Sequence, residues 1–251
     1  MSIIKNSSFW NFYIHKVVTQ LIVAYHNNMA LNILVSKIQD GSMKSIHNGD
    51  IEKVNQARTN FLLKNDINPI DTTLVRVKYE GDNYKRYFIA DNRYKGDGIM
   101  RESTIDCDAI VTLDFNHALF LPLADCIGVV LHDVNKNIMM VSHLGRHSLE
   151  QSGGITSVDY LTKYFDINPK ELKAWLSPAA GKESYPLSAF NNRGLHEVAF
   201  EQLTNVGVLP ENIELSSIDS AKDQKYYSHS QFLIGNRVSD GRFAIVAYMT
   251  R

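Results

Sequence analysis

Two residues that could do chemistry, Cys126 and His143, lie at the ends of neighbouring apolar segments. The segments 127–132 and 137–142 are joined by the polar turn 133–136, a pattern that predicts two paired strands. Such a pair brings Cys126 close to His143. A thiol beside an imidazole is either a metal ligand or a nucleophile activated by a base. Inert packing is the third interpretation, because free cysteine often behaves as a small hydrophobe.

Composition limits the classes of protein to consider. The 251 residues are 44% hydrophobic and 21% charged, which suits a folded chain with one sizeable core. A net charge of −1 gives no reason to expect nucleic acid or an anionic membrane as a partner. Two cysteines form no disulfide framework, and polar residues interrupt the apolar stretch 10–25, so it predicts neither a signal peptide nor a membrane span. We therefore expect a cytoplasmic protein.

The elements that position Cys126 and His143 follow from hydrophobic periodicity and turn residues. Strands are expected at 30–38, 73–77, 84–90, 109–112, 119–121, 127–132, 137–142, 172–176 and 243–249, and helices at 50–64, 153–165 and 191–206. The strands 73–77 and 84–90 are expected around the turn 80–83. The mixture has no strict βαβ rhythm, which favours an α+β sandwich over a doubly wound sheet. We predict an N-terminal extension at 1–29 and a single domain at 30–251.

Short motifs spread along the chain resemble those of one family. The sequence DCDAIVT at 106–112 resembles "GDALVT", LADC at 123–126 resembles "TADC", HLGR at 143–146 resembles "HAGW", and GRFA at 241–244 resembles "GRqaa". These are motifs of the YfiH-type laccase-domain proteins, also described as a polyphenol oxidase or purine nucleoside phosphorylase family. Because the motifs occur in the correct order over most of the chain, the sequence resembles a divergent member of that family.

The resemblance implies an α/β/β/α sandwich in which mixed sheets are layered between helices. It also implies a metal site, with zinc rather than copper, built from a histidine of "QVHG", the cysteine of "TADC" and the histidine of "HAGW". Members are described as acting on purine nucleosides, by phosphorolysis and in some cases by deamination of adenosine. Here Cys126 and His143 match two ligands, but Lys78, or Tyr79 if the register slips by one residue, stands where the first histidine belongs.

Two further residues are candidates for the site. His147 follows His143 by four positions, and this spacing would place both imidazoles on one helical face if a helix begins there. Cys126, His143 and His147 would then form a replacement zinc site. Arg58 matches an arginine of the family's "NR" motif and is a candidate catalytic residue that binds phosphate or a carboxylate. A surface ion pair is the alternative for Arg58.

Three functions remain open at this point. The first is a zinc enzyme whose partners are a purine nucleoside and phosphate. The second is a metal-free hydrolase, cell-wall precursor editing included, in which His143 activates the Cys126 thiol. The third is a family member without activity that binds a ligand or a partner. The sequence leaves the oligomeric state open.

Overall fold

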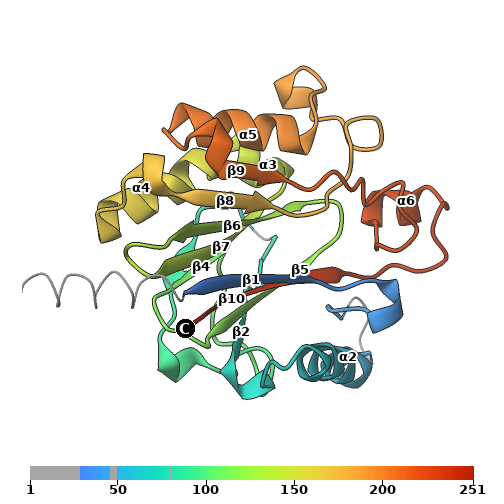
Figure 1. The fold of residues 1–251 in the computed structure, drawn as a ribbon. Helices are drawn as coiled ribbons and strands as arrows, with labels where there is room; N and C mark the ends of the chain where they lie inside the picture. The colour runs from blue at the N-terminus through green and yellow to red at the C-terminus, as the bar shows by residue number, and fades with distance from the viewer. Residues whose placement is uncertain (1–28, 46–49, 80) are drawn as a thin grey trace, which may run out of the picture.

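Two β-sheets form the centre of the molecule in the computed structural model, which describes residues 29–45, 50–79 and 81–251 (Figure 1). The smaller sheet has the strand order β1 (Ala30–Val35), β10 (Phe243–Thr250), β5 (Ala118–Leu123) and β2 (Thr72–Leu74). The larger sheet has the order β3 (Tyr87–Ile89), β4 (Ala109–Thr112), β7 (Ile138–Leu144), β6 (Ile127–Asp133), β8 (Lys173–Leu176) and β9 (Ile213–Leu215). Both sheets mix parallel with antiparallel neighbours.

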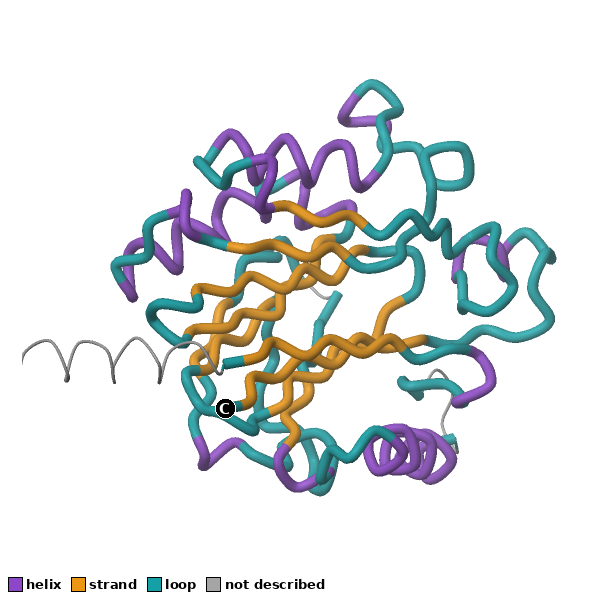
Figure 2. Tube along the Cα trace, in the orientation of Figure 1, coloured by secondary structure: helices purple, strands orange, loops and turns teal. Residues whose placement is uncertain are grey.

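Helices cover the outer faces of the two sheets. The larger sheet is covered by α3 (Arg146–Glu150), α4 (Gly153–Phe165) and α5 (Leu195–Asn205). On the other side of the molecule, α2 (Ile51–Lys64) packs against the smaller sheet (Figures 1 and 2). The short helix α6 (His229–Leu233) lies apart from both layers. These four layers confirm the expected α/β/β/α sandwich.

Side-chain alternation explains why the sheets stack in this way. In β6, Val129 and Leu131 pack toward the helices, whereas Val130 packs into the layer between the sheets. In β10, Ile245 enters the same central layer, and Val246 packs toward α2. A strand buried on both faces has a continuous apolar sequence, because neither face is left for polar residues.

The expected pairing of 73–77 with 84–90 is wrong. β2 pairs in parallel with β5 in the smaller sheet, and β3 pairs in parallel with β4 in the larger one. Between them, Val75 and Val77 are buried in the central layer, so this segment crosses from one sheet to the other. The crossing brings Tyr79 to the end of the β6–β7 hairpin.

Other predicted elements agree closely with the structure. The helices 50–64 and 153–165 are α2 and α4, with bounds within one residue of the prediction. The predicted helix 191–206 is shorter, because Asn191 and Asn192 adopt left-handed backbone angles and α5 begins only after Gly194. Of the predicted extension at 1–29, residues 1–28 lie outside the described residues. No helix in the described part of the chain has the length and apolar character needed to cross a membrane.

Candidate functional site

Cys126 and His143 meet at the end of the β6–β7 hairpin. The strands are antiparallel, and Gly128 of β6 faces His143 of β7. Cys126 precedes Gly128 by two residues, so its side chain lies on the same sheet face as that of His143. This face is the one turned toward the smaller sheet, since Cys126 packs against the central layer. The predicted hairpin is confirmed.

Gly145 leaves the space that lets these two side chains converge. A Cβ atom built on Gly145 would lie 2.8 Å from Sγ of Cys126 and 3.3 Å from Nε2 of His143. The thiol and the imidazole are therefore close to one common point. A side chain at position 145 would occupy that point and separate the two groups.

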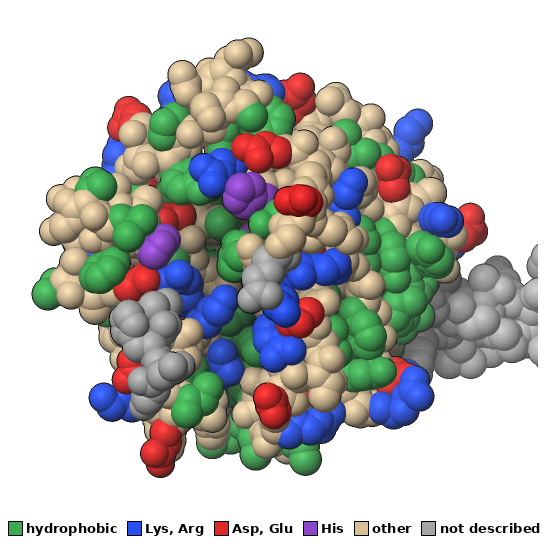
Figure 3. Space-filling view, turned by 180° about the vertical axis from the view of Figure 1, so that it is seen from behind, with side chains coloured by type: hydrophobic (Ala, Val, Ile, Leu, Met, Phe, Trp, Pro, Cys, Tyr) green, Lys and Arg blue, Asp and Glu red, His purple; other side chains and the backbone are tan. Residues whose placement is uncertain are grey.

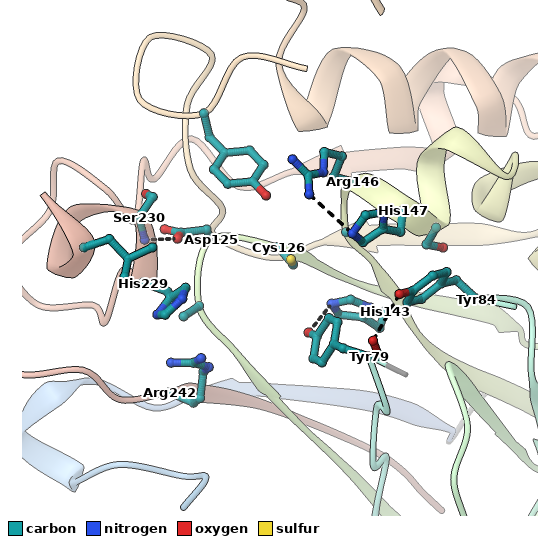
Figure 4. A pocket seen from close by; sticks show the side chains of 15 residues that line it. Tyr79, Tyr84, Asp125, Cys126, His143, Arg146, His147, His229, Ser230 and Arg242 are labelled. Carbon is teal, nitrogen blue, oxygen red and sulfur yellow. Dashed lines mark hydrogen bonds between the residues drawn. The ribbon is translucent and has the colours of Figure 1, made fainter. Parts of the chain in front are cut away.

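A cavity of about 340 Å³ opens above this pair, and we call it the hairpin cavity (Figure 4). Aromatic and cationic side chains dominate its lining. They include Tyr79, Tyr84, Tyr185, Arg146, His147 and Arg242. The volume lies within the range of small-molecule sites, which are about 300–1,000 Å³.

Burial keeps both reactive groups in their neutral forms. His143 is 2% exposed, and burial lowers the pKa of its imidazole to about 4 although Asp108 acts in the opposite direction. Burial, together with Asp125, raises the pKa of the Cys126 thiol to about 12. The pair at neutral pH is therefore a thiol beside an uncharged imidazole, and Nδ1 of that imidazole is buried without a hydrogen-bond partner.

Tyr79, and not Lys78, stands where the resemblance places the missing histidine. The Tyr79 hydroxyl lies 3.3 Å from Nε2 of His143, and the two rings meet edge to face. Burial raises the pKa of the Tyr79 phenol, and Cys126 acts in the same direction. The Lys78 ammonium instead lies 4.0 Å from Asp106. The cavity floor thus consists of three neutral groups, those of Tyr79, Cys126 and His143.

A charged network forms another part of the cavity wall. Nδ1 of His229 lies 3.0 Å from the carboxylate of Asp240, and Nη1 of Arg242 donates to the same carboxylate at 2.7 Å. Because a carboxylate only accepts, Nδ1 of His229 carries a proton. Its second nitrogen, Nε2, remains available for a ligand in the cavity. His229 and Asp240 are not among the candidates that the sequence indicates, because neither lies in one of the four motifs named above.

Asp125 holds the helix that carries His229. Its carboxylate accepts hydrogen bonds from the Ser228 hydroxyl and from the backbone N–H of Ser230, which fixes the beginning of α6. Asp125 itself has a positive φ of 73° and directly precedes Cys126. These bonds engage the oxygens of Asp125 away from Cys126 and His143, so Asp125 is no third member of a Cys–His triad.

Comparison with known proteins identifies the family. A family model described as multi-copper polyphenol oxidoreductase laccase matches residues 42–193. The chain belongs to this family. The matched range contains the whole β6–β7 hairpin together with Tyr79. No curated protein matches the chain.

Three solved structures share the fold. The hypothetical protein YfiH of Bacillus licheniformis has 18% identity and a TM-score of 0.74, covering 88% of this chain and 93% of its own. YlmD of Geobacillus stearothermophilus has 16% identity and a TM-score of 0.74, covering 89% and 92%. A Neisseria meningitidis protein of the family model DUF152 has 14% identity and a TM-score of 0.68, covering 88% and 95%. At these identities the likeness shows the YfiH-type fold.

The family's name implies copper, and the resemblance implies zinc, so the donor atoms of the floor need examination. Cys126 and His143 offer sulfur and nitrogen, both suited to zinc or copper. The third group is the Tyr79 phenol, whose raised pKa opposes the ionised form that binds metals. The described residues contain no group of three His, Cys, Asp or Glu side chains able to hold a metal ion. They do not fit the three-ligand set of a catalytic zinc.

His147 does not complete that set. The premise that His143 and His147 share a helical face is wrong, because His143 belongs to β7 and His147 to α3. The His147 ring stacks on Tyr84, with 5.0 Å between ring centroids, and its Nδ1 lies 3.5 Å from Glu150. His147 therefore contributes to the cavity wall beside Arg146 (Figure 4).

Arg58 lies outside the hairpin cavity. Its Nε donates to the carbonyl of Met43 and its Nη1 to that of Gly98, which ties α2 to two loops. The side chain is buried, and burial lowers its pKa to about 10. The alternative of a surface ion pair is wrong for this reason. Arg58 lines a second cavity, described below.

Proposed function

We propose that the chain is an enzyme that cleaves purine nucleosides with phosphate, and that the hairpin cavity is its active site. One observation carries the proposal: aromatic rings, cationic side chains and a His–Asp pair converge on one cavity of nucleoside size. Aromatic faces such as those of Tyr79 and Tyr185 suit a planar purine. A guanidinium group, here that of Arg146, suits a phosphate ion.

The proposed reaction needs one proton to be moved. A phosphate oxygen forms a bond to C1′ of the ribose while the bond from C1′ to the purine nitrogen breaks. The bonding electrons leave with the purine. Nε2 of His229 takes the proton of the attacking phosphate and gives it to a nitrogen of the departing purine, so that ribose 1-phosphate and free purine result. Asp240 holds the His229 ring and stabilises its transient positive charge.

The floor has a different task in this proposal. Cys126, His143 and Tyr79 present neutral polar atoms to the buried edge of the purine. Charged groups at this depth would have to lose their hydration, which costs free energy. The neutral floor therefore favours an uncharged base over a charged ligand.

A metal-free cysteine hydrolase is less favoured. Such an enzyme needs a thiolate paired with an imidazolium, but burial raises the pKa of Cys126 and lowers that of His143. Zinc, the cofactor implied by the resemblance, has two donors in Cys126 and His143, and the described residues supply no third. Deamination of adenosine through a zinc-bound water is less favoured on the same grounds.

The test is a turnover assay on freshly purified protein whose metal content is measured first. Adenosine, inosine and guanosine are each incubated with and without phosphate, and free base and deaminated product are separated by chromatography. We expect release of free base that requires phosphate and persists in the presence of a chelator. No release from any of the three nucleosides would refute the proposal. Binding without release would identify an inactive ligand-binding member of the family.

A further inference from the structure

A second cavity of about 570 Å³ adjoins the hairpin cavity, and we call it the basic cavity. Its lining includes Lys44, Arg58, Arg76, Arg101 and Arg242. Figure 3 shows Lys and Arg side chains around a hollow on the face opposite to that viewed in Figure 1. Glu102, an exposed residue, is the acidic side chain among the described residues of this lining.

Three of the arginines have carboxylate partners, and one of them is Arg242, whose Nη1 lies 2.7 Å from Asp240. Nε of Arg76 lies 2.7 Å from Asp106, and Nε of Arg101 lies 3.6 Å from Asp97. Their charges are largely balanced within the protein. The excess of positive charge must therefore come from the other cations of the lining.

Lys44 and Arg58 carry this excess. Among the described residues, the Lys44 ammonium has no ion pair and lies 5.3 Å from the centre of the Tyr79 ring. Burial lowers the pKa of Lys44, and repulsion by Arg242 and Arg58 lowers it further. Both hydrogen bonds of Arg58 go to backbone carbonyls, which leave its charge uncompensated. Arg58 and Arg242 thus both lie close enough to repel the Lys44 ammonium, with Asp240 as the carboxylate bound to Arg242.

The two cavities are neighbours that share lining residues. Tyr79, Ala124 and Arg242 line both of them. A single ligand can therefore place an uncharged aromatic part on the neutral floor of the hairpin cavity and an anionic part beside Lys44. Nucleotides have this composition, since a phosphate chain is joined through ribose to a base.

We infer that the basic cavity is a subsite for phosphate groups, and that the substrate is a nucleoside phosphate whose base occupies the hairpin cavity. The placement of the base rests on the proposed function. The phosphate subsite rests on Lys44, Arg58 and Arg242 alone. Phosphate accepts hydrogen bonds from both ammonium and guanidinium donors, and its negative charge would relieve the repulsion of Lys44 by Arg58 and Arg242.

Calorimetric titration of the purified chain tests this inference with three probes: inorganic pyrophosphate, adenosine and ADP. Lys44→Ala removes the ammonium without removing any hydrogen bond between described residues. Lys53→Ala is the matched control, since Lys53 is an exposed lysine of α2 whose loss changes the net charge equally. We expect Lys44→Ala to weaken pyrophosphate and ADP binding by about tenfold or more while adenosine affinity is unchanged. Lys53→Ala should leave all three affinities within about twofold of the parent values.

The three probes separate the two proposals. Pyrophosphate that fails to bind, or that binds Lys44→Ala and Lys53→Ala equally, would overturn the phosphate subsite whatever the turnover assay shows. ADP that binds no more tightly than pyrophosphate would overturn the nucleotide as substrate. Binding of ADP more tightly than either part supports a ligand that spans both cavities. Circular dichroism of Lys44→Ala shows whether the variant keeps the parent fold.

Discussion

The floor and the wall of the hairpin cavity differ in burial and in charge. On the floor, Cys126 and His143 are held neutral by desolvation, and Tyr79 shares their environment. On the wall, His229 is 43% exposed and hydrogen bonded to a carboxylate, so it can exchange protons with a ligand. In the proposed mechanism, the residues easiest to recognise in the sequence are not those that move protons. Reactivity depends on solvation as much as on residue type.

The largest change expected is in metal binding by the floor. Tyr79→His adds an imidazole to the cavity floor. The floor then has one cysteine and two histidines as metal ligands, where the parent has Cys126, His143 and a phenol. We expect the variant to retain about one zinc per chain after gel filtration, against far less for the parent. Elemental analysis measures this. Tyr84→His, which places an imidazole elsewhere on the cavity lining, should retain no more zinc than the parent.

The next largest effect is expected at the wall. His229→Gln removes the proton carrier while keeping a polar side chain, and we expect kcat for phosphorolysis to fall about a hundredfold. Gln231→Ala, on the same short helix, should keep parent activity, because among the described residues its side chain only accepts a hydrogen bond from Asn236. Equal activity of His229→Gln and the parent would remove His229 from the mechanism.

A smaller effect tests whether Cys126 is a neutral thiol or a reactive thiolate paired with His143. With its pKa raised to about 12, Cys126 should react with iodoacetamide at pH 8 about tenfold or more slowly than free cysteine. Mass spectrometry of peptides identifies the labelled residue. Cys107 is an internal reference, because burial raises the pKa of its thiol to about 12 as well. Fast labelling of Cys126 alone would contradict the neutral floor and favour the hydrolase.

A fourth effect concerns stability in acid. Burial lowers the pKa of His143 and of His117 from 6.5 to about 4, so the unfolded chain binds these protons more readily than the folded one. The stabilisation is present above pH 6.5 and is lost as the pH falls toward 4, by about 1.4 kcal/mol per pH unit for each histidine. Urea unfolding at pH 7, 6, 5 and 4 measures this slope. In His143→Phe, the slope of the unfolding free energy against pH should lack the contribution of one histidine.

Local patterns in the sequence were sufficient to predict the floor's hairpin. The apolar runs on either side of the turn 133–136 predicted two paired strands. This pairing brings Cys126 close to His143. The resemblance supplied the layered fold that the structure confirms. The choice between Lys78 and Tyr79 required the structure. The two residues are neighbours in a segment that crosses between the sheets, and a shift by one residue exchanges their positions.

The wall could not be predicted in the same way. His229 and Asp240 are joined across α6 and an irregular segment, where hydrophobic periodicity gives no information. The partners of Asp125 lie more than 100 positions away along the chain. The basic cavity depends likewise on Lys44 and Arg242, which come from opposite ends of the described chain. Contacts of this kind arise from tertiary packing and leave no local pattern.

The hydrogen bonds of Asp125 have a mechanical consequence for the cavity. Its carboxylate clamps the first turn of α6, and its backbone continues directly into Cys126. Any displacement of α6 by an incoming molecule therefore pulls on the peptide unit next to the thiol. Residue 125 thus links α6 directly to the residue that carries the thiol.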